Sequence, residues 1–344
     1  MARSKASLFD KLQYLYKTLV HQDGFLTLTQ SELVTVIVPV YNRAHAIARS
    51  IGSICNQSYR NLDILVVDDA SSDDIVSAVE ALKDPRVRLI RREKNGGAAA
   101  ARNIGVNAAR GALIAFHDSD DVVVFDKIER QVNLLHSMPP DYVAVYSAVQ
   151  FYLAADETNY ALMTSYVRPF PDTKLLSGDL SAQTMGANTV NLPTVLVRKT
   201  ALIAAGPSDE LMRNNVDWDL MIRLTRQGKF AFIPEPLYMA EFQHSRQVNS
   251  QRISRSAKFS TQSFVRISGK LRHQGYKGEQ LAKHYQVASN YLLRVGHVGF
   301  ARQFMRASLA QAPVNPKLWA HYGLSFVPFL HKRLLRIQKK TPKT

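Results

Sequence analysis

Two apolar segments of the chain end in clustered acidic side chains. The first ends in Asp68 and Asp69, and the second runs into Asp118, Asp120 and Asp121. Carboxylates brought this close together raise one another's pKa values unless a counter-charge lies among them. A divalent cation is the simplest counter-charge, and Asp118 and Asp120 offer the hard oxygen ligands that Mg²⁺ or Mn²⁺ prefers. The alternative is that these acids begin a helix, where they interact favourably with its dipole.

A glycine pair precedes an alanine-rich stretch with the composition of a helix. Gly96 and Gly97 follow Asn95, and Arg102 lies further along the same stretch. Glycines let the backbone approach a ligand closely, and a helix N-terminus favours an anion such as a phosphate. The pattern is not G-x-G-x-x-G, which disfavours a dinucleotide site, and the sequence contains no P-loop motif.

Apolar, β-branched stretches alternate with helical patterns between residues 34 and 152 and must position these side chains. Such alternation predicts right-handed βαβ units on a mostly parallel sheet flanked by helices, an α/β fold. Ligands bind outside the carboxyl ends of the strands in such sheets, which is where the acids fall. The expected strands are 34–40, 62–69, 87–91, 112–118 and 142–152, and the expected helices are 44–56, 73–82, 97–109 and 126–136.

The rest of the chain mixes both kinds of element and then becomes helical. Residues 155–190 show no regular pattern, and strand patterns end before residue 251. Strands are expected at 193–198 and 229–239, and helices at 199–205, 217–227, 255–274, 280–295, 298–311 and 316–337. We therefore expect three parts: residues 1–32, an amphipathic helix and a connector; residues 33–250, the α/β domain; and residues 251–344, a basic α-helical region.

The positive charge is concentrated in the last of these parts. Residues 251–344 hold 18 of the 44 Lys and Arg residues but only one of the 28 acidic residues, Glu279. The remainder of the chain is close to neutral, which disfavours a uniform coat for nucleic acid and favours a globular domain with a basic appendage. The single cysteine, Cys55, excludes an internal disulfide framework and a cysteine-based zinc cluster.

Four stretches resemble the nucleotide-sugar glycosyltransferases of family 2, which have the GT-A fold. In chain order they are VTVIVPVYNR (34–43), LDILVVDDASSDD (62–74), NGGAAAARNIGVNAARGALIAFHDSDD (95–121) and DWDLMIRL (217–224). The resemblance covers about residues 34–250. It implies an inverting transfer of one sugar from a nucleotide-diphosphate sugar, with a UDP-sugar favoured, assisted by Mn²⁺ or Mg²⁺. The acceptor implied is a hydroxyl of a glycan or of a lipid-linked sugar, in cell-surface polysaccharide synthesis.

The resemblance also assigns roles to residues of the donor site. Pro39 and Tyr41 would border the nucleobase, and one of Asp68 and Asp69, with Asp69 favoured, would accept from the uracil or ribose. Gly97 and Arg102 match the helix start that lines the nucleotide. Asp118 and Asp120 match the D-x-D motif, in which Asp120 is the firmer metal ligand, and Asp121 would support them.

On the acceptor side, the resemblance makes Asp217 the catalytic base, although Val216 stands where the family usually has Glu. The alternative is that Asp217 caps the helix that follows. His244, in the loop HSRQVNS, matches a histidine that approaches the diphosphate or the metal; the alternative is an ordinary surface histidine.

The C-terminal segment 319–343 carries six Lys and Arg residues after residue 330 and an apolar helical stripe. Such segments bind anionic membrane surfaces, although a solvated helix end has the same pattern. No secretory signal and no run of about 18 apolar residues is present, so we expect a cytoplasmic enzyme, peripheral on the inner face of the plasma membrane. The alternatives are a catalytically inactive GT-A scaffold, and a protein that binds nucleic acid or another polyanion through its basic region.

Overall fold

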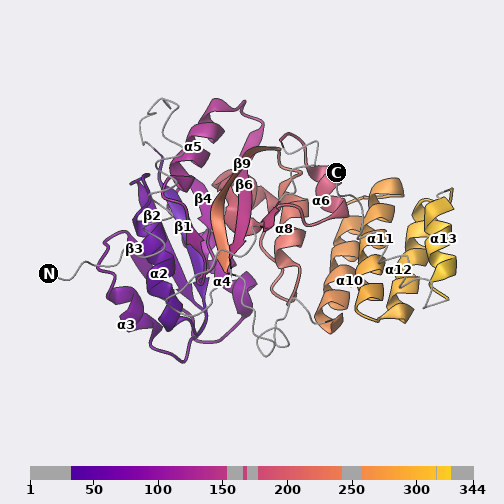
Figure 1. Cartoon of the computed structure of the whole chain (residues 1–344), viewed down its shortest axis with the longest axis horizontal. Helices are drawn as coiled ribbons and strands as arrows, with labels where there is room; N and C mark the ends of the chain where they lie inside the picture. Colours follow the sequence, from indigo (N-terminus) through magenta and orange to yellow (C-terminus); the bar gives the residue numbers. More distant parts are fainter. Residues whose placement is uncertain (1–31, 153–165, 169–176, 242–256, 315, 327–344) are drawn as a thin grey trace. The chain divides into compact units, whose positions relative to one another are not determined.

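The computed structural model describes residues 32–152, 166–168, 177–241, 257–314 and 316–326 (Figure 1). The chain divides into two compact units. The first unit comprises 1–180, 189–210 and 220–249, and the second comprises 181–188, 211–219 and 250–344. Two short segments that precede the boundary expected at residue 250 therefore belong to the second unit.

Four strands of the first unit form a parallel half-sheet in the order β3-β2-β1-β4. They are β1 (Val34–Val40), β2 (Leu62–Asp68), β3 (Val87–Arg91) and β4 (Leu113–Phe116). Every residue of β1, β2 and β4 is buried, as continuous β-branched runs covered on both faces require. Their carboxyl ends therefore lie along one edge, as the sequence predicts.

The other half of the sheet is mixed. β8 (Val195–Arg198) lies between β4 and β6 (Tyr142–Tyr152) and is antiparallel to both, while β9 (Lys229–Glu241) is parallel to β6. β5 (Val122–Val123) and β7 (Tyr166–Arg168) add antiparallel pairs to β9 and β6. The prediction of a mostly parallel sheet therefore holds for the first half of the sheet. The apolar pattern of a strand indicates that the strand is buried, but not whether it runs parallel or antiparallel to its neighbours.

Helices cover both faces of this sheet (Figure 1). One face packs Val36, Val38 and Ile64 against α2 (Ala44–Cys55), α3 (Ile75–Glu80) and α5 (Lys127–Ser137). The other face packs Ile37 and Leu65 against α4 (Gly97–Ala108), with α7 (Lys199–Ala205), the turn η1 (Leu192–Thr194) and the later residues of α8 (Val216–Leu224) in the same layer. Gly105 allows α4 to lie close to β1, since a Cβ there would sit 2.4 Å from Cγ2 of Ile37.

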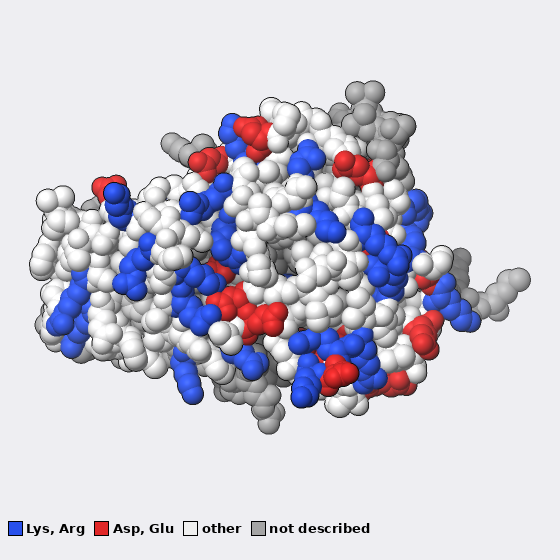
Figure 2. Space-filling view, turned by 180° about the vertical axis from the view of Figure 1, so that it is seen from behind, with Lys and Arg blue, Asp and Glu red and all other residues white. Residues whose placement is uncertain are grey.

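The described part of the second unit is helical. Its elements are α6 (Ser181–Gly186), α10 (Ala257–His273), α11 (Gly278–Arg294), α12 (Val298–Gln311) and α13 (Pro316–Leu324). Helices α10 to α13 display Lys and Arg with few acids among them (Figure 2). Among the residues that the structure describes, no helix combines the length and apolarity needed to cross a bilayer. The N-terminal helix expected at 8–20 and most of the segment 319–343 lie outside these residues.

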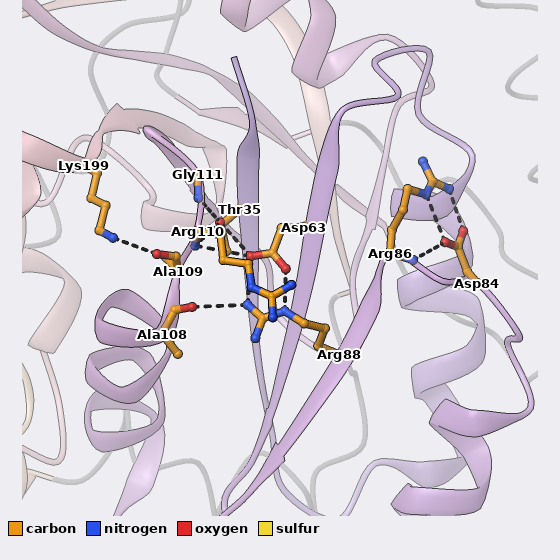
Figure 3. Close-up of polar contacts among 10 residues, drawn as sticks. All are labelled: Thr35, Asp63, Asp84, Arg86, Arg88, Ala108, Ala109, Arg110, Gly111 and Lys199. Atoms are coloured by element: carbon orange, nitrogen blue, oxygen red, sulfur yellow. Dashed lines mark hydrogen bonds and ion pairs between the residues drawn. The ribbon is translucent and has the colours of Figure 1, made fainter. Parts of the chain in front are cut away.

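A polar network ties the amino-terminal ends of the parallel strands together (Figure 3). The buried carboxylate of Asp63 in β2 accepts hydrogen bonds from Nε and Nη2 of Arg88 in β3, at 2.6 and 2.9 Å, and from Oγ1 of Thr35 in β1 at 2.9 Å. Oγ1 of Thr35 also accepts from the backbone N–H of Gly111 at 2.8 Å. One buried charge thereby joins three strands and the turn that follows α4.

Asp63→Asn is expected to lower the free energy of unfolding by about 2–4 kcal/mol at pH 7, because Arg88 loses its buried counter-charge. Burial acts to raise the pKa of Asp63, but the hydrogen bonds from Arg88 and Thr35 outweigh it and lower that pKa. This stabilisation is present above the unfolded-state pKa of about 4 and is lost as the pH falls through the lower folded-state value.

Urea unfolding from pH 7 downward measures this effect, and the difference between wild type and Asp63→Asn should shrink as the pH falls. The matched control is Asp141→Asn, which removes a half-exposed ion pair with Lys229 and should cost less than about 1 kcal/mol. Equal losses in the two variants would contradict the assigned role of Asp63.

Candidate active site

The loops after β1 and β2 are fastened to each other at the carboxyl edge of the sheet. Asn42 adopts a positive φ of 52°, a region that asparagine tolerates better than most residues. Its backbone N–H donates to Oγ of Ser71 at 2.9 Å, and its Oδ1 accepts from the N–H of Ser72 at 2.8 Å. Pro39 is buried within β1, whereas Tyr41 is 48% exposed. Of the two residues predicted to border a nucleobase, Tyr41 is therefore the one that presents its side chain.

Asp69 holds the glycine pair in place. Its Oδ1 accepts from the backbone N–H of Gly96 at 3.0 Å and pairs with Nη1 of Arg92, and its Oδ2 accepts from the N–H of Gly97 at 2.6 Å. Gly97 has a φ of 84°, which favours glycine at the first residue of α4. The buried Asp69 carboxylate therefore sets the shape of the turn that the sequence predicts to line a nucleotide.

Asp68 is fully buried beside it. Its Oδ1 accepts from the N–H of Ser71 at 2.9 Å, and Nε of Arg91 lies 3.2 Å from its Oδ2. Nη2 of Arg91 also donates to the carbonyl of Ser71 at 2.9 Å. Asp68 and Asp69 thus each pair with an arginine at the carboxyl end of β2.

These arginines line a cavity of about 480 Å³ at the carboxyl ends of β2 and β3. Its lining residues are Ala70, Ser71, Arg91, Arg92 and Glu93. Sequence reasoning missed both arginines. Arg92 directly follows β3, so the rule that ligands bind at strand ends would have identified it had it been applied to this strand.

The D-x-D carboxylates are partly exposed at this edge. The side chains of Asp118 and Asp120 are 39% and 33% exposed. Nη2 of Arg102 lies 3.0 Å from Oδ1 of Asp118, and Nε of Arg43 lies 3.8 Å from Oδ2 of Asp120. Partial enclosure and the charge of Asp120 raise the pKa of Asp118, while the Arg102 guanidinium opposes this rise.

Buried side chains support the D-x-D turn from behind. The Tyr238 hydroxyl in β9 donates to Oδ2 of Asp121 at 2.8 Å and accepts from the backbone N–H of Asp118 at 3.2 Å. His117 lies 2.9 Å from Oγ of Ser50, and burial, helped by a nearby lysine, lowers its pKa to about 3. A neutral His117 and the Tyr238 hydroxyl thus fix the backbone that carries the two exposed carboxylates.

The donor set of this turn fits a hard divalent cation. Two partly exposed carboxylates, already steered by arginines, supply oxygen ligands and leave other coordination positions to phosphate oxygens and water. Within the described ranges, no group of three or more His, Cys, Asp or Glu side chains is arranged to hold a metal ion. His244, the third ligand expected from the sequence, lies outside the described residues.

Asp217 lies in the first turn of α8, in the segment that belongs to the second unit. Because α8 begins at Val216, Asp217 is inside the helix and does not cap it. Its Oδ2 accepts from Nδ2 of Asn188 at 3.0 Å. The next two residues, Trp218 and Asp219, are buried. Asn188 lies where the sequence shows no regular pattern, so nothing in the sequence indicates its contact with Asp217.

A family model of glycosyl transferase family 2 matches residues 35–180, which include the parallel strands, the glycine turn and the D-x-D turn. These residues belong to glycosyl transferase family 2 and are named the family 2 domain, residues 35–180. Among curated relatives, this chain is 43% identical over 103 residues to the UDP-Glc:alpha-D-GlcNAc-diphosphoundecaprenol beta-1,3-glucosyltransferase WfgD of Escherichia coli. That match covers 30% of this chain and 41% of the relative, so the chain spans less than half the length of relatives such as this one.

Two solved structures share the fold over most of the chain. TarS residues 1–349 of Staphylococcus aureus, in complex with UDP-GlcNAc, give a TM-score of 0.63 at 15% identity, covering 90% of this chain and 92% of TarS. The mannosyltransferase PcManGT of Pyrobaculum calidifontis, in complex with GDP-Man and Mn²⁺, gives 0.58 at 19% identity, covering 96% and 91%. These likenesses confirm the GT-A fold of the family 2 domain and the helical C-terminal region.

Proposed function

We propose that this chain is an inverting, metal-dependent glycosyltransferase that moves one sugar from a nucleotide-diphosphate sugar to a hydroxyl group. The observation that carries the proposal is the edge of the family 2 domain, where Asp69 shapes a glycine turn and Asp118 and Asp120 present exposed carboxylates. An edge with a helix N-terminus, arginines and cation ligands suits a nucleoside diphosphate with a bound cation.

The cavity lined by Arg91 and Arg92 is the proposed nucleotide subsite, and Tyr41 and Gly97 are proposed to contact the same ligand. A uracil edge offers two carbonyl acceptors around one N–H donor, which complements arginine donors beside an aspartate acceptor such as Asp69. The complex of TarS with UDP-GlcNAc supports a UDP-sugar as the donor. Because PcManGT forms a complex with GDP-Man, a GDP-sugar is the alternative donor to be tested.

Asp118 and Asp120 are the residues proposed to hold Mn²⁺ or Mg²⁺, with His244 as a further candidate ligand. When bound there, the cation offsets the negative charge that grows on the leaving diphosphate. The Mn²⁺ in the PcManGT complex supports this assignment. Arg102 lies against Asp118 and would help to orient it toward the diphosphate.

Asp217 is the proposed base. As the acceptor oxygen bonds to the anomeric carbon, the bond between that carbon and the phosphate oxygen breaks, and Asp217 takes the hydroxyl proton. The configuration at the anomeric carbon is inverted, and the nucleoside diphosphate leaves. The hydrogen bond from Asn188 to Oδ2 leaves Oδ1 as the oxygen that receives the proton.

The proposed acceptor is a glycan or a lipid-linked sugar in cell-surface polysaccharide synthesis, as the name of the WfgD relative suggests. A lipid-linked acceptor is consistent with attachment to the inner face of the plasma membrane through the basic segment 319–343. Each Lys or Arg close to an anionic surface contributes about 1 kcal/mol to such binding.

A thermal-shift panel of UDP-, dTDP- and GDP-sugars tests the donor proposal. A ligand that binds only the folded state raises the melting temperature, so we expect the largest rise with a UDP-sugar in the presence of Mn²⁺. Absence of any rise with every nucleotide sugar, with Mn²⁺ or Mg²⁺ present, would contradict the proposal.

Arg92→Ala is expected to weaken UDP binding about tenfold or more, because it removes charged donors from the nucleotide subsite. Titration calorimetry with UDP and Mn²⁺ measures the change. The control Arg110→Ala removes an exposed arginine at the opposite end of the strands and should leave the affinity within about twofold. Equal affinities of Arg92→Ala and wild type would place the nucleotide elsewhere.

A further inference from the structure

We propose that Lys270 of α10 is a positioning residue for the base Asp217, so that the C-terminal helices take part in the reaction through the first turn of α8. The inference rests on the proposed function, since it needs Asp217 to be the base. It assigns the helices after residue 257 a role that neither the charge of the region nor the family 2 match indicates.

The first contact is an ion pair two residues beyond the base. Nζ of Lys270 lies 3.0 Å from each carboxylate oxygen of Asp219, whose side chain is only 3% exposed. Lys270 also reaches Sδ of Met212, at 3.8 Å, in the loop before α8. The Lys270 side chain is 30% exposed, but its partner carboxylate is buried, so loss of Lys270 removes a charged partner from a buried group and loosens the helix turn.

The second contact involves the residue between Asp217 and Asp219. The indole N–H of Trp218 donates to the carbonyl of Thr184 in α6 at 2.5 Å. Its ring meets Phe264 of α10 edge-on, with centroids 5.8 Å apart, and lies 5.5 Å from the ring of His284 in α11. Three helices of the second unit therefore enclose this one side chain.

The third set of contacts fixes the chain as it enters α8. Nδ2 of Asn214 donates to Oγ of Ser260 at 2.7 Å, and Oγ of Ser263 donates to the carbonyl of Asn214 at 2.5 Å. The next residue, Asn215, has a positive φ of 56° immediately before the helix begins. Helix α10 thus holds both the entry to α8 and its first turn.

These contacts leave Asp217 in a fixed direction. Successive helical residues are about 100° apart, so the anchored Trp218 and Asp219 define where Asp217 points. Asp217 is half-buried, unlike Trp218 and Asp219, and Asn188 holds only its Oδ2. Loss of the Lys270 contact would release the turn that carries the base without touching the donor-site residues of the family 2 domain.

The test uses full-length Lys270→Met, with Lys283→Met as the matched control, an exposed lysine of α11. The probe is the UDP-sugar that gives the largest thermal shift, with Mn²⁺ and with water as acceptor, and the readout is UDP release. We expect Lys270→Met to lower kcat about 10–100-fold while KM and the UDP affinity stay within about twofold. Lys270→Arg should recover most of the rate, and Lys283→Met should match wild type.

A kcat of Lys270→Met within twofold of wild type, beside an inactive Asp217→Asn, would overturn this inference and leave the proposed function standing. A loss shared equally by kcat and UDP affinity would overturn it too, since that is the mark of general unfolding. Full activity of Asp217→Asn would remove the proposed base and this inference together. If Lys270→Met does not fold, Lys270→Arg and Asp219→Asn carry the same comparison.

Discussion

Asp120→Ala is expected to lower the Mn²⁺-dependent release of UDP from a UDP-sugar by about 10³-fold or more, close to 4 kcal/mol of transition-state stabilisation. Asp120 is one of two partly exposed carboxylates on the D-x-D turn, and within the described residues no third acid or histidine is placed to hold a metal ion with them. Removing it takes away half of that ligand set and one of its negative charges. A coupled assay of UDP release, with and without added Mn²⁺, measures the loss.

The control for Asp120→Ala is Asp141→Asn, since Asp141 is an exposed acid of the same unit paired with Lys229. It should keep wild-type turnover and the same Mn²⁺ dependence. Wild-type turnover in Asp120→Ala, with the Mn²⁺ dependence unchanged, would mean that the cation binds elsewhere and that the proposed site is wrong.

Asp217→Asn is expected to lower turnover by about 10²–10⁴-fold, the range that a general base contributes. Asparagine keeps the shape of the side chain but cannot accept the acceptor's proton. UDP affinity should not change, because Arg92, Gly97 and Asp120 remain intact. The comparison is between kcat from UDP release and the dissociation constant of UDP from calorimetry.

Asn188→Ala serves as the companion variant, since it removes the hydrogen bond to Oδ2 of Asp217 and leaves the carboxylate itself. Its loss of kcat should be smaller than that of Asp217→Asn. A fall in UDP affinity as large as the fall in kcat, or undiminished kcat in Asp217→Asn, would be inconsistent with Asp217 as the base.

The strand positions were predictable because the strands are uninterrupted apolar runs between turn signals. The strands expected at 34–40, 87–91 and 142–152 match β1, β3 and β6 residue for residue. The site edge followed from one rule, since parallel strands bring their carboxyl ends together. That rule placed Asp69 and Asp118 on one edge.

The direction of β8 and the partners of the site residues were not predictable. Tyr238 supports Asp121 from 117 residues away, and Lys270 holds Asp219 from 51 residues away. Periodicity reports which side chains face a core, but it does not report which distant side chain they meet there. The position of Asn188 was even less predictable, because its segment of the sequence shows no helical or strand periodicity.

The central claim is that this chain transfers a sugar from a nucleotide donor with inversion, and proton NMR of UDP-glucose turnover tests it most directly. With diamagnetic Mg²⁺ and water as acceptor, the central claim predicts release of UDP together with the β-anomer of glucose, formed before mutarotation mixes the anomers. Asp120→Ala and Asp217→Asn should abolish both signals. First appearance of the α-anomer, or release that persists in both variants, would contradict the account.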